Sequence, residues 1–121
     1  MKLILAILRI SKMQETKKAL EDVGLPSFTV MPVIGRGRGH GDLEKSHNYD
    51  PEHHELITAV PRMKSKRMIA LVVTDEKKDA AIEALMKVNH TGESGDGKIF
   101  VIDTVDSVHI RTGASGNATL D

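Results

Sequence analysis

The sequence lacks cysteine and tryptophan, and its only aromatic residues are Phe28, Tyr49 and Phe100. Without cysteine, the chain can form neither a disulfide framework nor a thiolate metal site. The scarcity of aromatic residues argues against binding of single-stranded nucleic acid, which depends on stacking platforms. A net charge is lacking too, because 17 basic residues balance 17 acidic ones. No overall electrostatic attraction to nucleic acid or to an anionic membrane is therefore expected.

Long apolar runs are absent as well. The opening run is apolar for only about eight residues before Arg9, too short for a signal peptide with its cleavage site and far too short for a membrane span. We therefore expect a cytoplasmic protein without membrane insertion. Its 121 residues, 40% hydrophobic and 28% charged, predict a single domain, 1–121, with one modest aliphatic core. Zero net charge does little to prevent self-association and mildly favours an oligomer.

The first third of the chain predicts a strand followed by a helix. Residues 2–10 form a continuous apolar run rich in Ile and Leu, which is typical of a strand buried on both faces. Ser11 is a candidate N-cap for a helix over residues 12–23. Gly24 then supplies a C-terminal stop, and Pro26 prevents the helix from continuing.

Two more strands and a second helix follow. Residues 27–34 predict a strand, and Pro32 within it indicates an edge position or a bulge. Residues 67–74 predict a strand that leads into a helix over residues 76–89, for which Asp75 is a candidate cap. The intervening polar stretch, from Gly35 to about Pro61, is a long loop of the kind that is usually functional or disordered in a compact domain.

The remainder predicts a glycine-rich loop over residues 91–97, a strand over residues 98–105 and an extended piece over residues 108–112. The two halves align, with residues 3–8 on residues 68–73, so the element order is βαββαβ. Two right-handed βαβ units predict an α+β, ferredoxin-like fold, with a four-stranded antiparallel sheet and both helices on one face. The other face would be bare, and such a face is normally covered by another subunit.

Residues 92–98 match the phosphate-loop pattern G-x-x-x-x-G-K, but Ile99 stands where that pattern has Ser or Thr. A true P-loop runs from strand to helix, so that phosphates meet a helix N-terminus. Here the order is helix, loop, strand, and we reject that interpretation. Three glycines followed by Lys98 still suit a nest of backbone amides that binds an anion. The alternative is a solvated turn with a chance lysine.

Residues 35–41 alternate glycine with Arg36, Arg38 and His40. This run fits no register of the dinucleotide-binding pattern G-x-G-x-x-G, and no helix is predicted after it, so we reject that interpretation too. The guanidinium groups could contact phosphates, or the run could be a flexible, soluble loop stem.

Histidines gather in the same long loop, among several acidic residues, which raises the hypothesis of a transition-metal site. None of their spacings matches a rigid helical pair, and polar loops also gather histidine by chance. No paired carboxylates or nucleophile–base couple stands out, so the sequence makes no positive case for an enzyme. The four histidines are His40, His47, His53 and His54.

Near the end of the chain, the segment HIRTG (109–113) places His109 and Arg111 on alternate residues of the predicted extended piece, so both would face one side. Together with KLILAILRISKMQETKKALEDVG, FTVMPVIGRGR, IALVV and TGESGDGKIF, this segment makes the chain resemble the PII signal-transduction family, also called nitrogen regulatory protein P-II. The resemblance covers most of the chain, and the paired signatures TG-x-x-GDGKIF and IRTG are specific. In its atypical long loop the chain is similar to the PII-like subgroup encoded among nitrogen-fixation genes of methanogenic archaea.

The resemblance implies a homotrimer, or a related assembly with a paralogue, in which the sheets pack inward. Residues 36–62 would be the family's T-loop, residues 91–98 its B-loop and residues 109–113 its C-terminal loop. ATP or ADP would bind in clefts between subunits and scarcely be hydrolysed. The ATP-binding residues that the resemblance implies are Ile7, Thr29 and Val72 around the adenine, Gly35, Gly37 and Arg38 at the loop base, Gly95, Asp96, Gly97 and Lys98 on the phosphates, and His109 and Arg111, the latter from the neighbouring subunit.

The resemblance also implies effectors and a protein target. With Mg²⁺ and ATP present, 2-oxoglutarate would bind near the base of the long loop, close to Gly39 and to Lys66, with Lys64 as the alternative lysine. The loop would then change conformation and decide whether a nitrogen-metabolism protein is bound. In the methanogen subgroup that target is nitrogenase. The alternative function is a PII-like trimer that binds a metal or another small ligand through its histidine-rich loop.

Three departures from the family pattern bear on these expectations. A Gln and a Lys that usually follow the position of Arg38 are missing, and that Gln normally helps to hold Mg²⁺ and 2-oxoglutarate, so the usual mode of 2-oxoglutarate binding is not assumed. His109 replaces the first arginine of the C-terminal loop and would contact phosphate well only when protonated. Tyr49 lies in HNYDP rather than L-Y-R-G-A-E-Y, so uridylylation is not assumed.

Overall fold

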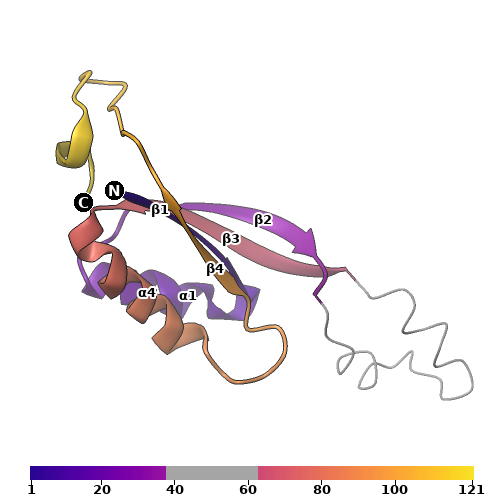
Figure 1. Cartoon of the computed structure of the whole chain (residues 1–121). Helices are drawn as coiled ribbons and strands as arrows, with labels where there is room; N and C mark the ends of the chain where they lie inside the picture. The colour runs from indigo at the N-terminus through magenta and orange to yellow at the C-terminus, as the bar shows by residue number, and fades with distance from the viewer. Residues whose placement is uncertain (38–62) are drawn as a thin grey trace, which may run out of the picture.

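The structure, a computed structural model, describes residues 1–37 and 63–121. Four strands and two helices make up the main body (Figure 1), with a short 3₁₀ turn before the first helix and another near the C-terminus. In chain order the elements are β1 (Lys2–Leu8), η1 (Ile10–Lys12), α1 (Met13–Asp22), β2 (Thr29–Gly35), β3 (Lys64–Val73), α4 (Asp75–Asn89), β4 (Lys98–Asp103) and η3 (Gly116–Thr119).

The four strands form one sheet in the order β2-β3-β1-β4, and every neighbouring pair is antiparallel. The helices α1 and α4 lie side by side on one face of this sheet (Figure 1). This arrangement confirms the predicted ferredoxin-like α+β fold. It also confirms the edge position predicted for Pro32, because β2 is an outer strand and its proline faces no second neighbour.

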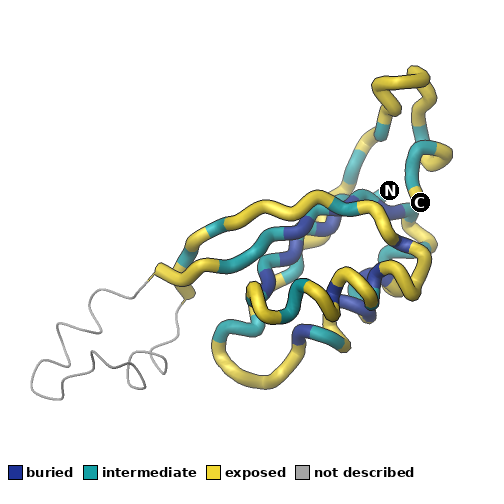
Figure 2. The backbone as a smooth tube through the Cα atoms, turned by 180° about the vertical axis from the view of Figure 1, so that it is seen from behind, coloured by how far each residue is buried: buried dark blue, intermediate teal, exposed yellow. Residues whose placement is uncertain are grey.

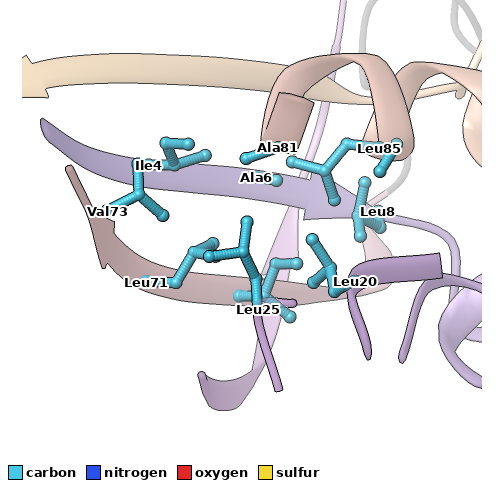
Figure 3. Close-up of a cluster of buried hydrophobic side chains, with 11 residues drawn as sticks. Ile4, Ala6, Leu8, Leu20, Leu25, Leu71, Val73, Ala81 and Leu85 are labelled. Carbon is cyan, nitrogen blue, oxygen red and sulfur yellow. The ribbon is translucent and has the colours of Figure 1, made fainter. Parts of the chain in front are cut away.

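The core lies between the sheet and the two helices, and its buried hydrophobic residues are all aliphatic (Figure 3). Alternate residues of β1 and β3 point toward the helices, as the two-residue period of a strand requires. Each helix contributes its inward stripe to the same layer. The buried hydrophobic residues are Ile4, Ala6, Leu8, Leu20, Leu25, Ile69, Leu71, Val73, Ala81, Ala84 and Leu85.

Helix α1 ends as predicted at Gly24, which adopts a left-handed conformation with φ of 79°. The Gly24 amide donates to the carbonyl of Glu21 at 3.0 Å, and the Leu25 amide donates to the carbonyl of Leu20 at 2.8 Å. These two bonds form a Schellman motif, in which the residue after the glycine packs back on the helix. Leu20 and Leu25 accordingly share the core.

Both predicted helix caps are wrong. Ser11 lies inside η1, and α1 begins only after Lys12, without a side-chain cap. For the second helix the extended residue is Thr74, so Asp75 is already the first helical residue. The carboxylate of Asp75 pairs instead with the N-terminal ammonium of Met1, at 3.1 Å.

Strand limits also differ from the prediction. Strand β1 ends at Leu8, because the chain turns into η1 immediately after Arg9, and β4 ends at Asp103. The extended piece predicted over residues 108–112 is instead a tight turn. The Gly113 amide donates to the carbonyl of His109 at 2.8 Å.

The sheet face that points away from the helices is apolar and only partly buried. The sequence predicted that β1 is buried on both faces, but in the single chain only its helix side is fully buried. Its outward residues are half-buried, and Figure 2 shows the buried stretches mainly along the central strands and within the helices. This helix-free face, as the register of the strands defines it, carries Leu3, Leu5, Ile7, Met31, Met68, Ala70, Val72, Phe100 and Ile102.

Among the described residues, no helix combines the length and hydropathy that a membrane span needs.

Candidate functional site

The glycine-rich loop, residues 91–97, joins the end of α4 to the start of β4. Three glycines in it, Gly92, Gly95 and Gly97, have φ values of 86°, 97° and 102°, a region that L side chains rarely adopt. A Cβ atom at Gly97 would lie 1.8 Å from the carbonyl oxygen of Ile7. The loop therefore passes directly against the end of β1, and only glycine permits that approach.

The carboxylate of Asp96 points back into this loop. Its Oδ2 accepts hydrogen bonds from the amides of Thr91 and Gly92, at 2.8 and 2.9 Å. Its Oδ1 accepts from the Thr91 hydroxyl and from Nη1 of Arg9, the latter at 2.6 Å. The hydrogen bonds from Thr91, together with those from Arg9 and Gly92, hold the pKa of Asp96 well below its usual range. The side chain is therefore an ionised clamp at neutral pH.

Two cationic side chains reach the loop from the sheet. Arg9, which follows β1, also donates through Nη2 to the carbonyl of Ser94 at 3.0 Å. Lys66, on β3, donates through Nζ to the carbonyl of Gly95 at 2.6 Å. Burial lowers the pKa of Lys66, and the nearby charges of Arg9 and Lys64 lower that pKa further. The site therefore concentrates positive charge at one end of the sheet.

These cations lie on the side of Gly95 from which a side chain would project. A Cβ atom there would lie 3.4 Å from Nη2 of Arg9 and 3.5 Å from Nζ of Lys66. Within the described parts of the chain, the amide of Gly95 donates no hydrogen bond, Ser94 and Gly95 form a turn that ends at Asp96, and Lys98 has no ion pair. A free loop amide beside fixed cations is an element of an anion-binding nest. The arrangement can hold a phosphate or a carboxylate without any catalytic group.

Sequence reasoning named Lys66 for this region but missed Arg9, Thr91 and Ser94. The available signal for Arg9 was its place as the first charged residue after the apolar run of β1, at the strand end that the loop approaches. Thr91 and Ser94 gave no comparable signal, because their roles depend on how the loop folds. The geometry therefore adds one cation and two loop contacts to the predicted set.

The three predicted adenine contacts, Ile7, Thr29 and Val72, all lie on the helix-free face, but not in one place. In the sheet Ile7 is opposite Met68, whereas Val72 is four residues further along the same strand, which is about 13 Å. Thr29 is opposite Ala70, next to Val72. Ile7 alone adjoins the glycine-rich loop, so one chain does not assemble the predicted pocket.

The C-terminal segment corrects a further prediction. Residues 110–112 form a turn, closed by a bridge between Val108 and Ser115, so His109 and Arg111 do not alternate along a strand and need not face one side. This turn follows β4, whereas the glycine-rich loop precedes β4. Within one chain the two features therefore lie at opposite ends of that strand, as Figure 1 shows.

The stem of the long loop lies at the cationic end of the sheet. Gly35 is opposite Lys64, and β3 continues from there to Lys66. Gly37 is exposed at the end of the described stem. The predicted site residues Arg38 and Gly39 lie outside the described residues.

The same is true of the histidines on which the metal hypothesis rests. In residues 1–37 and 63–121 no group of His, Cys, Asp and Glu side chains is arranged to hold a metal ion. His40, His47, His53 and His54 lie outside those ranges, so the hypothesis stays a prediction.

Comparison with known proteins agrees with the family resemblance found in the sequence. Residues 1–114 match the family model described as nitrogen regulatory protein P-II. Over 121 residues the chain is 41% identical to a protein of Methanothermobacter marburgensis named "Nitrogen fixation nifHD region GlnB-like protein 2", covering 99% of this chain and 100% of that protein. It is 39% identical over 122 residues to a protein of Methanococcus maripaludis with the same name, with 99% and 100% coverage. It is also 40% identical over 115 residues to "Nitrogen regulatory protein P-II" of Pasteurella multocida, with 93% and 94% coverage.

Proposed function

Because this chain belongs to the nitrogen regulatory protein P-II family, we propose that it senses ATP, ADP and 2-oxoglutarate and regulates a nitrogen-metabolism protein through residues 36–62. The nucleotide is bound as a signal and is not hydrolysed. The observation that supports this proposal is the glycine-rich loop, in which Nη2 of Arg9 and Nζ of Lys66 lie together beside Gly95.

The phosphates of ATP or ADP bind to the end of this loop. Gly95, Gly97 and the backbone of Asp96 supply the turn and the amides, and Lys98 supplies a mobile charge. A chain of left-handed glycines is suited to this role, because successive amides can point at one anion.

The nucleotide site is completed by a neighbouring copy of the chain. Ile7 adjoins the loop, whereas Thr29 and Val72 lie further along the helix-free face. His109 and Arg111 lie beyond the far end of β4. These residues can surround one nucleotide only if two copies contribute, and the apolar helix-free face gives copies a reason to associate. The homotrimer implied by the family resemblance meets both requirements.

A dicarboxylate such as 2-oxoglutarate binds between Arg9 and Lys66. Their cationic atoms lie on the same side of Gly95, and paired cations bind carboxylates by charge-assisted hydrogen bonds. Lys66 is taken as the effector lysine because its Nζ donates to the carbonyl of Gly95 at 2.6 Å, within the glycine-rich loop. Such a ligand would also contact the base of the long loop, because Gly35 and Lys66 share one end of the sheet. In this way binding of the ligand changes the conformation of residues 36–62.

The regulated target is a nitrogenase component. The support for this choice is that the similar methanogen proteins carry "nitrogen fixation nifHD region" in their names. Binding of ATP and 2-oxoglutarate shifts the long loop between states, by as much as these ligands favour one state over the other.

Calorimetric titration with ATP, ADP and 2-oxoglutarate, alone and combined with Mg²⁺, tests the proposal. We expect ATP and ADP to bind alone, and 2-oxoglutarate to bind only when Mg²⁺ and ATP are present. Phosphate release should stay at the background rate during the titration. Absence of nucleotide binding, or 2-oxoglutarate binding that ignores ATP, would contradict the proposed sensor.

A further inference from the structure

Asp96 is the most heavily engaged side chain of the glycine-rich loop. Both of its carboxylate oxygens face inward, toward the amides of Thr91 and Gly92, the hydroxyl of Thr91 and the guanidinium of Arg9. It stands between Gly95 and Gly97, whose left-handed conformations turn the chain so that the side chain faces the start of its own loop.

This orientation matters for an anionic ligand. A carboxylate that faced a phosphate would repel it, whereas an inward carboxylate is engaged by the amides of residues 91 and 92 and leaves the amide of Gly95 unpaired. The same carboxylate holds Arg9 at 2.6 Å, while the carbonyl of Ser94 holds the other guanidinium nitrogen. Arg9 is thereby fixed in one orientation, with its Nη2 3.4 Å from the position that a Cβ atom at Gly95 would take.

We propose that Asp96 is a positioning residue of the anion site and contacts neither phosphate nor metal through its carboxylate. It closes residues 91–96 into one shape and sets Arg9 beside Gly95, so that the ligand meets a preformed site. This inference rests on the proposed nucleotide-binding function and departs from the direct phosphate contact that the family resemblance implies for Asp96. Preorganisation of this kind raises affinity because the ordering cost is met before the ligand binds.

The variant Asp96→Asn keeps the size of the side chain but removes its charge and places a donor where acceptors are needed. ATP affinity should fall about tenfold, and by the same factor with Mg²⁺ and with EDTA. If the carboxylate held Mg²⁺, the loss would appear only with Mg²⁺. If it merely stood close to the phosphates, its neutralisation would strengthen binding in EDTA. Either of these results overturns the proposal.

Glu93→Gln is the matched control, because it removes the same charge from the same loop at an exposed side chain. Its ATP affinity should stay within about twofold of the unmodified protein.

Thr91 offers a second, milder test, since its hydroxyl donates to Asp96. Thr91→Val should weaken ATP binding, and Thr91→Ser, which keeps the hydroxyl, should restore it. Equal behaviour of the valine and serine variants would count against a clamp.

A measurement without ligand separates this inference from the function on which it rests. Amide hydrogen exchange should be about tenfold faster at Thr91 and Gly92 in Asp96→Asn than in Glu93→Gln, because both amides lose their acceptor. If the unmodified protein binds no ATP, the proposed function fails, and the exchange result alone decides whether Asp96 shapes the loop. Unchanged exchange at both amides would overturn the inference, whatever the ATP affinity.

Discussion

Gly97 shows how one residue constrains the candidate site. A side chain there would meet the backbone carbonyl of Ile7 at 1.8 Å, and that carbonyl belongs to a central strand of the sheet. At Gly92 the backbone is also left-handed, but nothing lies within 4 Å of the position that a Cβ atom would take. The two glycines therefore separate the cost of backbone conformation from the cost of collision.

Gly97→Ala should lower the free energy of unfolding by more than the about 1–2 kcal/mol that a left-handed alanine costs. Gly92→Ala should lower the free energy of unfolding by about that conformational cost alone. Urea unfolding followed by circular dichroism measures both variants, and calorimetry measures their ATP affinity. Equal destabilisation by the two substitutions would mean that the loop moves away from β1 without penalty.

Lys98 is a second single residue whose role can be tested. It is exposed and forms no ion pair with the described residues. Lys98→Ala should weaken ATP binding by about 1–3 kcal/mol, the scale of a charge-assisted hydrogen bond, and leave the unfolding free energy unchanged. Lys87→Ala, an exposed lysine on α4, is the control for loss of one positive charge. An unchanged calorimetric affinity for Lys98→Ala would remove this lysine from the site.

At the scale of elements, α1 and α4 are joined by a buried polar pair. Thr16 and Asn89 are the buried polar side chains of the described residues. Nδ2 of Asn89 donates to the Thr16 hydroxyl at 3.1 Å and to the carbonyl of Leu85 at 2.9 Å, and the hydroxyl donates to the carbonyl of Lys12 at 2.8 Å. Oδ1 of Asn89 has no partner among the described residues. The pair fixes how the two helices meet, at a cost in stability from the unpaired oxygen.

Replacing one partner of this pair should harm the protein more than replacing both. Thr16→Val leaves Asn89 with one acceptor fewer, and it should cost about 1–2 kcal/mol. The double variant Thr16→Val with Asn89→Leu removes the buried polar groups together, and its unfolding free energy should return toward that of the unmodified protein. A double-mutant cycle by urea unfolding measures the coupling. Additive losses would show that the hydrogen bond between the helices contributes nothing.

At the scale of the whole molecule, the sheet is covered on one side only. Phe100 and Ile102 on β4 are each 44% exposed on the helix-free face, beside the half-buried residues of β1. Apolar area of this extent is unfavourable in water and is normally covered by another chain. The same face carries Ile7, Thr29 and Val72, so the proposed assembly and the proposed nucleotide site would draw on one surface.

Phe100→Asp should therefore reduce the assembly to single chains, because a charge buried between copies is not compensated. Sedimentation velocity measures the mass, and circular dichroism shows whether each chain stays folded. Met86→Asp is the control, since Met86 is similarly exposed, at 48%, but lies on α4 at the opposite face. An unchanged mass for Phe100→Asp would mean that the copies meet elsewhere. ATP binding should fall with dissociation, because the second copy is lost from the site.

Much of the fold was predictable because its signals are local. The Gly24 stop, the edge position of Pro32 and the βαββαβ order follow from residue type and period, and each is confirmed. The caps at Ser11 and Asp75 were wrong, since helix starts depend on backbone angles that neighbouring residues can also adopt. The strand predicted at His109 and Arg111 was wrong for a similar reason, because a closing hydrogen bond to Gly113 favours a turn.

The sequence by itself determined the class of fold, the glycine-rich loop and the family, because hydrophobic period and short motifs act through nearby residues. Only the tertiary structure decided what the loop contacts. Arg9 and Asp96 are far apart along the chain, and their 2.6 Å ion pair exists because β1 and β4 are neighbours in the sheet. The separation of Ile7 from Thr29 and Val72 is likewise a consequence of strand register. Long-range contacts of this kind follow from how the strands pair, and no local pattern encodes them.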